Sequence, residues 1–136
     1  MGDAERVSQL ITELGYPTTF EAMRDRLSRI LTDPNYATFV ADRDGDVVGV
    51  AGATLSWYYE KDGMYSRLAV LAVSSTARGL GIGGQLVQAT EAWAIAKGVR
   101  EVFVNSGLHR GDAHRFYERC GYSQTGFRFV KQLNAG

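Results

Sequence analysis

Apolar side chains recur three or four positions apart near the start of the chain. This spacing predicts a first amphipathic helix over residues 4–14, which ends at Gly15. A second helix restarts after the segment "GYPTTFE", where a threonine before Glu21 resembles a helix cap, and continues to about Thr32. The apolar positions of the first helix are Val7, Leu10, Ile11 and Leu14.

The next stretch, "YATFVADRDGDVVGVAGATLSWYY", alternates in the manner of β-strands. It predicts two strands joined by a hairpin at Asp44-Gly45, a dipeptide typical of tight β-turns. A second hairpin through "EKDG" leads into "MYSRLAVLAV". The near-continuous apolar end of this segment predicts a strand buried on both faces.

The glycine-rich segment is predicted to open a third helix, which runs to Lys97 and stops at Gly98. Its expected apolar stripe consists of Ile82, Leu86, Ala89, Trp93 and Ala96. The rest of the pattern predicts a strand in "REVFVNS", a short helix in "DAHRFYERC" and a last strand in "YSQTGFRFVKQL". This order of elements predicts an α+β domain with a mixed, mostly antiparallel sheet covered by helices.

Composition narrows the class of protein. With 136 residues, of which 45% are hydrophobic and 22% charged, we expect one globular domain over residues 1–136. The net charge is zero and no block of Lys or Arg is present, so neither nucleic acid nor a membrane is expected as a partner. The single cysteine, Cys120, and the lack of a signal-peptide pattern favour the cytoplasm, and two histidines with one cysteine predict no metal site.

The segment "SSTARGLGIGGQLV" places four glycines within six residues where a helix begins. Glycine weakens a helix by roughly 1 kcal/mol relative to alanine, so these residues need another purpose. The N–H groups at a helix N-terminus bind anions, and glycine lets a phosphate approach the backbone closely. The alternative is that small residues only allow close packing of the helix on the sheet. The four residues are Gly79, Gly81, Gly83 and Gly84.

Three phosphate-bearing ligands fit such a helix start. A nucleotide-triphosphate loop needs Lys and then Ser or Thr after its last glycine, whereas Gln and Leu follow Gly84. Gly79, Gly81 and Gly84 satisfy the dinucleotide pattern G-x-G-x-x-G, but residues 74–78 separate them from the preceding strand. The next strand also lacks the acidic residue that binds a ribose, which disfavours a dinucleotide. The third ligand is the pyrophosphate of coenzyme A.

The stretch "LAVSSTARGLGIGGQLV" resembles the acyl-CoA-binding motif of the GNAT superfamily of N-acetyltransferases. That motif has Gln or Arg, then two residues, Gly, one residue, and Gly or Ala, and it falls on Arg78, Gly81 and Gly83. "HRFYERCGY" is similar to the family's later motif, and the order of elements over residues 3–133 agrees. The resemblance implies a GNAT-like fold without the family's first strand, and Arg110 stands where the family commonly has asparagine.

The resemblance also implies transfer of an acetyl group from acetyl-CoA to a primary amine of a small molecule or protein by direct attack. Tyr117 matches the tyrosine that donates a proton to the CoA sulfur, and a phenol with a pKa of ~10 is protonated at neutral pH. Glu60 is the candidate general base, although an exposed turn glutamate is the plainer interpretation. A non-catalytic acyl-CoA-binding module is the alternative function. The residues expected to bind acetyl-CoA are Leu71, Ala72, Val73, Arg78, Gly79, Leu80, Gly81, Ile82, Gly83, Gly84 and Phe116.

The wall that faces the amine is expected from the "GYPTTFE" connection and the "WYYEKDGMY" hairpin. Their aromatic residues suggest an apolar lining with one carboxylate, or else the contact of a homodimer. These aromatic residues are Tyr16, Trp57, Tyr58 and Tyr59. His109, His114 and Arg110 receive no assigned role, and Cys120 is expected to be a small buried thiol.

Overall fold

The computed structural model describes residues 2–105, 111–126 and 129–133. The chain divides into two compact units, Met1–Val104 and Asn105–Gly136. The first unit contains a four-stranded sheet with the helices that pack on it, and the second contains α4 (Gly111–Arg119). None of the helices within these described ranges combines the length and apolar character needed to cross a membrane.

The first two helices follow the predicted pattern. α1 spans Ala4–Leu14 and ends at Gly15, whose φ of 120° lies in a region that favours glycine. α2 spans Phe20–Ile30, slightly shorter than predicted. The Thr19 side-chain oxygen accepts a hydrogen bond from the Ala22 N–H at 3.1 Å, so the predicted threonine cap is confirmed.

The sheet has the strand order β1-β2-β3-β4. β1 (Tyr36–Arg43), β2 (Asp46–Trp57) and β3 (Met64–Val73) are antiparallel neighbours, and β4 (Val102–Val104) pairs parallel to β3. The Asp44-Gly45 hairpin is confirmed, because these residues have φ of 55° and 86°, as a tight hairpin turn requires.

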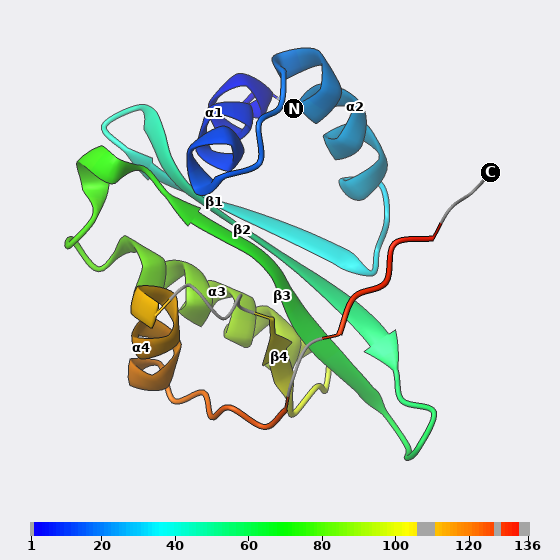
Figure 1. Cartoon of the computed structure of the whole chain (residues 1–136). Coiled ribbons are helices and arrows are strands. Elements are labelled where there is room, and N and C mark those ends of the chain that lie inside the picture. The colour runs from blue at the N-terminus through cyan, green and yellow to red at the C-terminus, as the bar shows by residue number, and fades with distance from the viewer. Residues whose placement is uncertain (1, 106–110, 127–128, 134–136) are drawn as a thin grey trace. The chain divides into compact units, whose positions relative to one another are not determined.

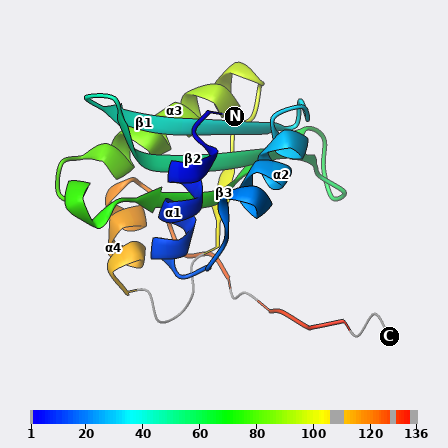
Figure 2. The ribbon, with the colours of Figure 1, turned by 90° about the horizontal axis from the view of Figure 1, so that it is seen from above.

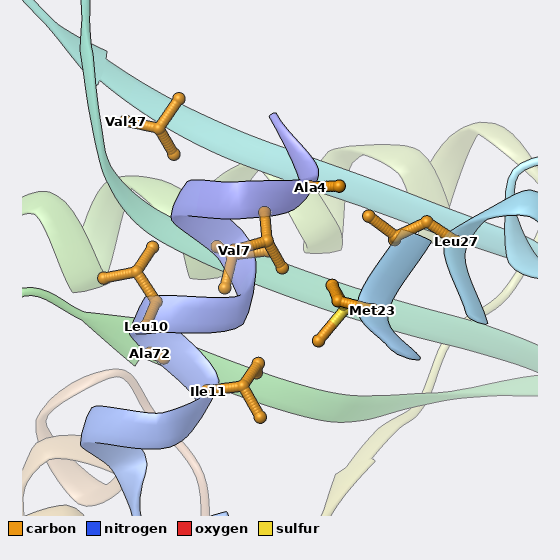
Figure 3. Packing of buried hydrophobic residues seen from close by; sticks show 9 residues of the cluster. Ala4, Val7, Leu10, Ile11, Met23, Leu27, Val47 and Ala72 are labelled. Carbon is orange, nitrogen blue, oxygen red and sulfur yellow. The ribbon is translucent and has the colours of Figure 1, made fainter. Parts of the chain in front are cut away.

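Helices cover both faces of this sheet. Figures 1 and 2 show α1 and α2 on one face and α3 (Ile82–Ala96) on the other. In Figure 3, apolar side chains of α1 and α2 point toward β2 and β3. Burying each large side chain contributes about 1.5–3 kcal/mol, so this cluster fixes α1 against the end of β3. The cluster consists of Ala4, Val7, Leu10, Ile11, Met23, Leu27, Val47, Val50 and Ala72.

The buried stripe of α3 differs from the predicted one. Of the predicted positions Leu86 is buried, but Trp93 is only half-buried and Ala96 is exposed. Thr90 is buried because its hydroxyl donates to the Leu86 carbonyl at 3.1 Å, which satisfies the polar group inside the helix. A prediction based on apolar residues alone therefore misses Thr90 and places the buried stripe on the wrong positions. The observed buried residues are Leu86, Val87, Thr90 and Ala94.

The prediction that β3 is buried on both faces was wrong. Ala69 is exposed, and Leu71 and Val73 are only half-buried. The cause is that pairing with β4 ends at Leu68, so the apolar end of β3 has a neighbouring strand on one side only within the first unit.

The prediction of a last strand in "YSQTGFRFVKQL" was also wrong, since residues 122–126 and 129–133 form no strand. Alternating residues form a strand only where a neighbour supplies hydrogen-bond partners and cross-strand contacts. No strand among the described residues pairs with this segment. β4 is likewise shorter than the predicted "REVFVNS".

Candidate active site

The central strand β3 is irregular at the point where its pairing with β4 ends. Residues 52 and 53 of β2 face Val70 and Leu68, so Ala69 is an extra residue in β3, as in a β-bulge. β4 pairs with β3 only as far as Leu68. The edge of β3 over residues 69–73 therefore has no strand partner on that side in the first unit.

The bulge also changes the direction in which the backbone groups of β3 point. Before it, the Ser66 N–H donates to a carbonyl beside β4 at 3.1 Å, and after it the Ser74 N–H donates to a carbonyl of β2 at 2.8 Å. The N–H groups of a strand alternate between its two edges. The N–H groups of Leu71 and Val73 thus point to the unpaired edge, whereas that of Ala72 points to β2.

The link between β3 and α3 is held by α1. It begins with a 3-10 turn, η1 (Ser75–Ala77), whose first N–H donates to the Glu13 carboxylate at 2.5 Å. This hydrogen bond is the main cause that lowers the pKa of Glu13, and the charge of Arg78 adds to it. An Arg78 nitrogen lies 3.9 Å from that carboxylate, and the Arg78 Nε donates to the Val73 carbonyl at 3.4 Å. The Arg78 side chain is 62% exposed, so most of its guanidinium is open to a ligand.

Packing does not explain Gly79, Gly81 or Gly84 at the start of α3. A Cβ at Gly79, Gly81 or Gly84 would meet no atom within 4 Å. The first two have φ of 81° and 78°, which makes glycine necessary there, but Gly84 has no such reason. The close approach of α3 to the sheet occurs elsewhere, at Gly49, where a Cβ would lie 2.9 Å from the Leu86 Cδ1.

The start of α3 offers free backbone donors. Its first backbone hydrogen bond runs from the Gln85 N–H to the Gly81 carbonyl at 3.1 Å. The N–H groups of residues 82–84 therefore have no acceptor within the helix. The positive end of the helix dipole and the charge of Arg78 both favour an anion at this position.

The two aromatic residues predicted for the site lie in the second unit. Phe116 and Tyr117 are adjacent, half-buried residues of α4, and their ring centroids are 5.3 Å apart. The Tyr122 ring lies 6.0 Å from that of Tyr117. Cys120 is half-buried, which is less than the buried thiol that the sequence suggested. His109 and Arg110 lie outside the described residues.

Glu60 is exposed in the connection between β2 and β3, at the opposite end of β3 from the glycines. Next to it is a cluster that the sequence analysis missed. The Tyr58 hydroxyl donates to the Glu101 carboxylate, and the Lys61 Nζ lies 3.1 Å from the same oxygen. The hydrogen bond to Glu101 raises the pKa of Tyr58 to about 12. Only the register of β4 brings Glu101 to this turn, so no sequence pattern signals the contact.

Comparison with known proteins settles the family. The profile of the Acetyltransferase (GNAT) family matches residues 4–122. The chain belongs to the GNAT acetyltransferase family. It is 35% identical over 132 residues to the aminoalkylphosphonate N-acetyltransferase of Salmonella typhimurium. The matched region covers 96% of this chain and 86% of that relative.

Solved structures agree on the GNAT fold. A GNAT family acetyltransferase from Staphylococcus aureus has 26% identity and a TM-score of 0.83, covering 97% of this chain and 93% of that one. An aminoglycoside N-acetyltransferase solved with CoA has the same fold at 21% identity and a TM-score of 0.86, covering 98% of this chain and 90% of that one. The predicted family, the α+β fold and an acetyltransferase enzyme are confirmed.

Proposed function

We propose that this GNAT protein transfers an acetyl group from acetyl-CoA to a primary amine by direct attack within a ternary complex. The observation that carries the proposal is the unpaired edge of β3 beyond the bulge at Ala69, next to a helix start with free N–H groups. Family membership supports acetyl transfer, and the acceptor is a small molecule or a protein amine.

The residues present fit acetyl-CoA. Arg78 and the N–H groups of residues 82–84 would hold the pyrophosphate. The open space at Gly84 supports this, because a phosphate could approach the backbone there. Charge-assisted hydrogen bonds of this kind contribute roughly 1.5–3 kcal/mol each. The N–H groups of Leu71 and Val73 would receive the extended arm and the thioester oxygen at the unpaired edge.

The reaction requires stabilisation of the carbonyl oxygen, protonation of the leaving sulfur and removal of a proton from the amine. Acetyl-CoA supplies the acetyl group, which passes to the amine nitrogen as the C–N bond forms and the C–S bond breaks. The Leu71 N–H would stabilise the negative charge that develops on the carbonyl oxygen. Tyr117 would donate its hydroxyl proton to the leaving sulfur. The amine would release its proton to water, because Glu60, the base expected from the sequence, lies before the start of β3 and Leu71 lies near its far end.

The names of the relatives support a choice of acceptors to test. The Salmonella relative at 35% identity is named for aminoalkylphosphonates, so small amines that carry an anionic group are the first acceptors to test. An amine panel should also include neutral alkylamines and aminoglycosides, since an aminoglycoside enzyme shares the fold.

Calorimetric titration with acetyl-CoA, with NADH as the control ligand, tests the binding half of the proposal. We expect acetyl-CoA alone to bind. Thiol release in the presence of the amine panel then tests catalysis. Binding without thiol release from any amine would favour the non-catalytic acyl-CoA-binding module, and binding of NADH alone would favour the dinucleotide interpretation of the glycines.

A further inference from the structure

An exposed arginine, Arg67, lies in the middle of the central strand β3. Arg67 lies two residues before the extra residue Ala69 and is paired with Thr54 of β2 and Phe103 of β4. It is exposed although it belongs to an interior strand of the sheet. No carboxylate among the described residues forms an ion pair with it.

The register of β2 defines the face on which Arg67 lies. A Cβ at Gly49 would touch Leu86, so Gly49 faces α3. Alternation along β2 then puts Val50 and Thr54 on the opposite face, and Val50 indeed packs in the cluster with α1 and α2. Arg67, as the cross-strand partner of Thr54, lies on this same face. Its exposure indicates that the two helices leave this part of the face open.

The surroundings of Arg67 leave its guanidinium available. Glu101 precedes β4, but its carboxylate binds Tyr58 and Lys61. Phe103 is on the same face and its ring packs edge-on against Tyr65 at 5.4 Å, which gives the position an apolar border. A guanidinium with no carboxylate beside it binds a phosphonate or carboxylate through two parallel hydrogen bonds.

The location also suits a second substrate. The glycines and α3 lie on one face of the sheet, and Arg67 lies on the other, so two substrates can reach the edge of β3 from opposite sides. At ~3.3 Å per residue, Arg67 and Leu71 are about 10–13 Å apart along the strand. A short amine with an anionic end, together with an extended arginine side chain, spans this separation.

We propose that Arg67 binds an anionic group on the amine acceptor, so the preferred acceptors are small primary amines that carry a phosphonate or a carboxylate. This inference rests on the proposed acetyl transfer. It assigns a specificity residue that the CoA motif does not contain, and the Thr54 hydroxyl on the same face can donate a further hydrogen bond to the anion.

The test compares three acceptors of similar size, aminoethylphosphonate, β-alanine and propylamine, with acetyl-CoA at saturation. We expect the wild-type chain to prefer the anionic amines. Arg67→Gln should raise the KM for them about 10- to 100-fold, from the loss of a charge-assisted hydrogen bond. The rate with propylamine should not change, and Arg67→Lys should recover part of the loss. The matched control is Arg43→Gln, since Arg43 is also an exposed strand arginine.

A binding measurement provides a readout independent of turnover. Aminoethylphosphonate, in the presence of CoA, should raise the thermal midpoint of the wild-type and Arg43→Gln chains but not that of Arg67→Gln. An unchanged KM for both anionic amines in Arg67→Gln, or a wild-type preference for propylamine, would overturn the inference while acetyl transfer stands. If no amine, propylamine included, released thiol, both the proposed function and this inference would fail.

Discussion

At the scale of single residues, Gly84 separates the two explanations for a glycine-rich helix start. A Cβ at this position meets nothing, so Gly84→Ala should raise the free energy of unfolding by up to ~1 kcal/mol through helix propensity. The same methyl group would occupy the space of a phosphate, so acetyl-CoA affinity should fall about tenfold, a change of ~1.4 kcal/mol. Thermal denaturation and calorimetry measure the two effects.

The control for this substitution is Gln88→Ala, at an exposed position of the same helix, which should leave affinity unchanged. Full affinity in Gly84→Ala would argue against a phosphate at this turn. Gly81 is a poorer position for the test, because its φ of 78° strains any other residue and would lower stability as well.

The proposed role of Tyr117 depends on its hydroxyl group and not on the packing of its ring. Tyr117→Phe keeps the ring that packs with Phe116 and Tyr122 but removes the proton donor. We expect kcat to fall about 100-fold or more while acetyl-CoA affinity stays nearly the same. Steady-state kinetics on a good amine, beside Tyr122→Phe as control, measure this. An unchanged kcat would remove Tyr117 from the mechanism.

Sequence motifs point to some of these candidate residues and not to others. Arg78 and the glycines are local in the chain, so a motif captures them. Arg67 and Glu13 acquire their importance only from the register of β3 and from the contact of α1 with η1. Such long-range contacts leave no periodic signal in the sequence.

At the scale of elements, Gly49 sets how closely α3 approaches the sheet. In Gly49→Ala the new methyl group would lie 2.9 Å from the Leu86 Cδ1 and 3.2 Å from the Ile82 Cγ2. Overpacking of this kind destabilises by about 1–3 kcal/mol. Because the clash falls on side chains of α3, we expect it to shift the start of this helix relative to the sheet. We therefore expect lower stability and weaker acetyl-CoA binding, measured by urea denaturation and calorimetry.

Gly52→Ala is the matched control, because its methyl group would approach the Val70 Cγ1 at 3.0 Å on the other face of the sheet. It should lower stability without a comparable loss of acetyl-CoA affinity. Equal losses of affinity in the two variants would show that general destabilisation, rather than the position of α3, weakens binding.

The contact between α1 and η1 predicts a pH dependence. The pKa of Glu13 lies below its ordinary value of 4.5 in the folded chain because the carboxylate accepts the Ser75 N–H. Its contribution to stability is therefore present above pH 4.5 and is lost as the pH falls through the lowered pKa. We expect the wild-type thermal midpoint to fall more steeply below that pH than the midpoint of Glu13→Gln, which keeps an acceptor oxygen without titrating. Parallel curves would contradict this role.

Element prediction succeeded where local signals decide the structure. The Asp44-Gly45 turn and the Thr19 cap depend on residues within a few positions of one another. The predicted buried stripe of α3 was wrong because a hydrogen bond to the Leu86 carbonyl allows the polar residue Thr90 to be buried. The last strand failed because alternation does not reveal whether a pairing partner exists.

At the scale of the whole molecule, the proposed chemistry requires the two units to act on one ligand. Arg78, Leu71 and Val73 belong to Met1–Val104, whereas Tyr117 belongs to Asn105–Gly136. If both units contribute to one acetyltransferase site, as we propose, acetyl-CoA should protect parts of each unit. Hydrogen exchange of backbone amides, compared with and without acetyl-CoA, measures this protection in each unit.

We expect slower exchange at residues 69–73 and at the first turn of α3, where free N–H groups would bind the ligand. α4 should also become protected, because Tyr117 would contact the leaving sulfur. β1 serves as the internal reference, since its hydrogen bonds to β2 are already formed without ligand. Protection confined to the first unit would mean that Tyr117 does not reach the bound thioester. Proton donation would then have to come from water, and the case for a non-catalytic acyl-CoA-binding module would become the stronger one.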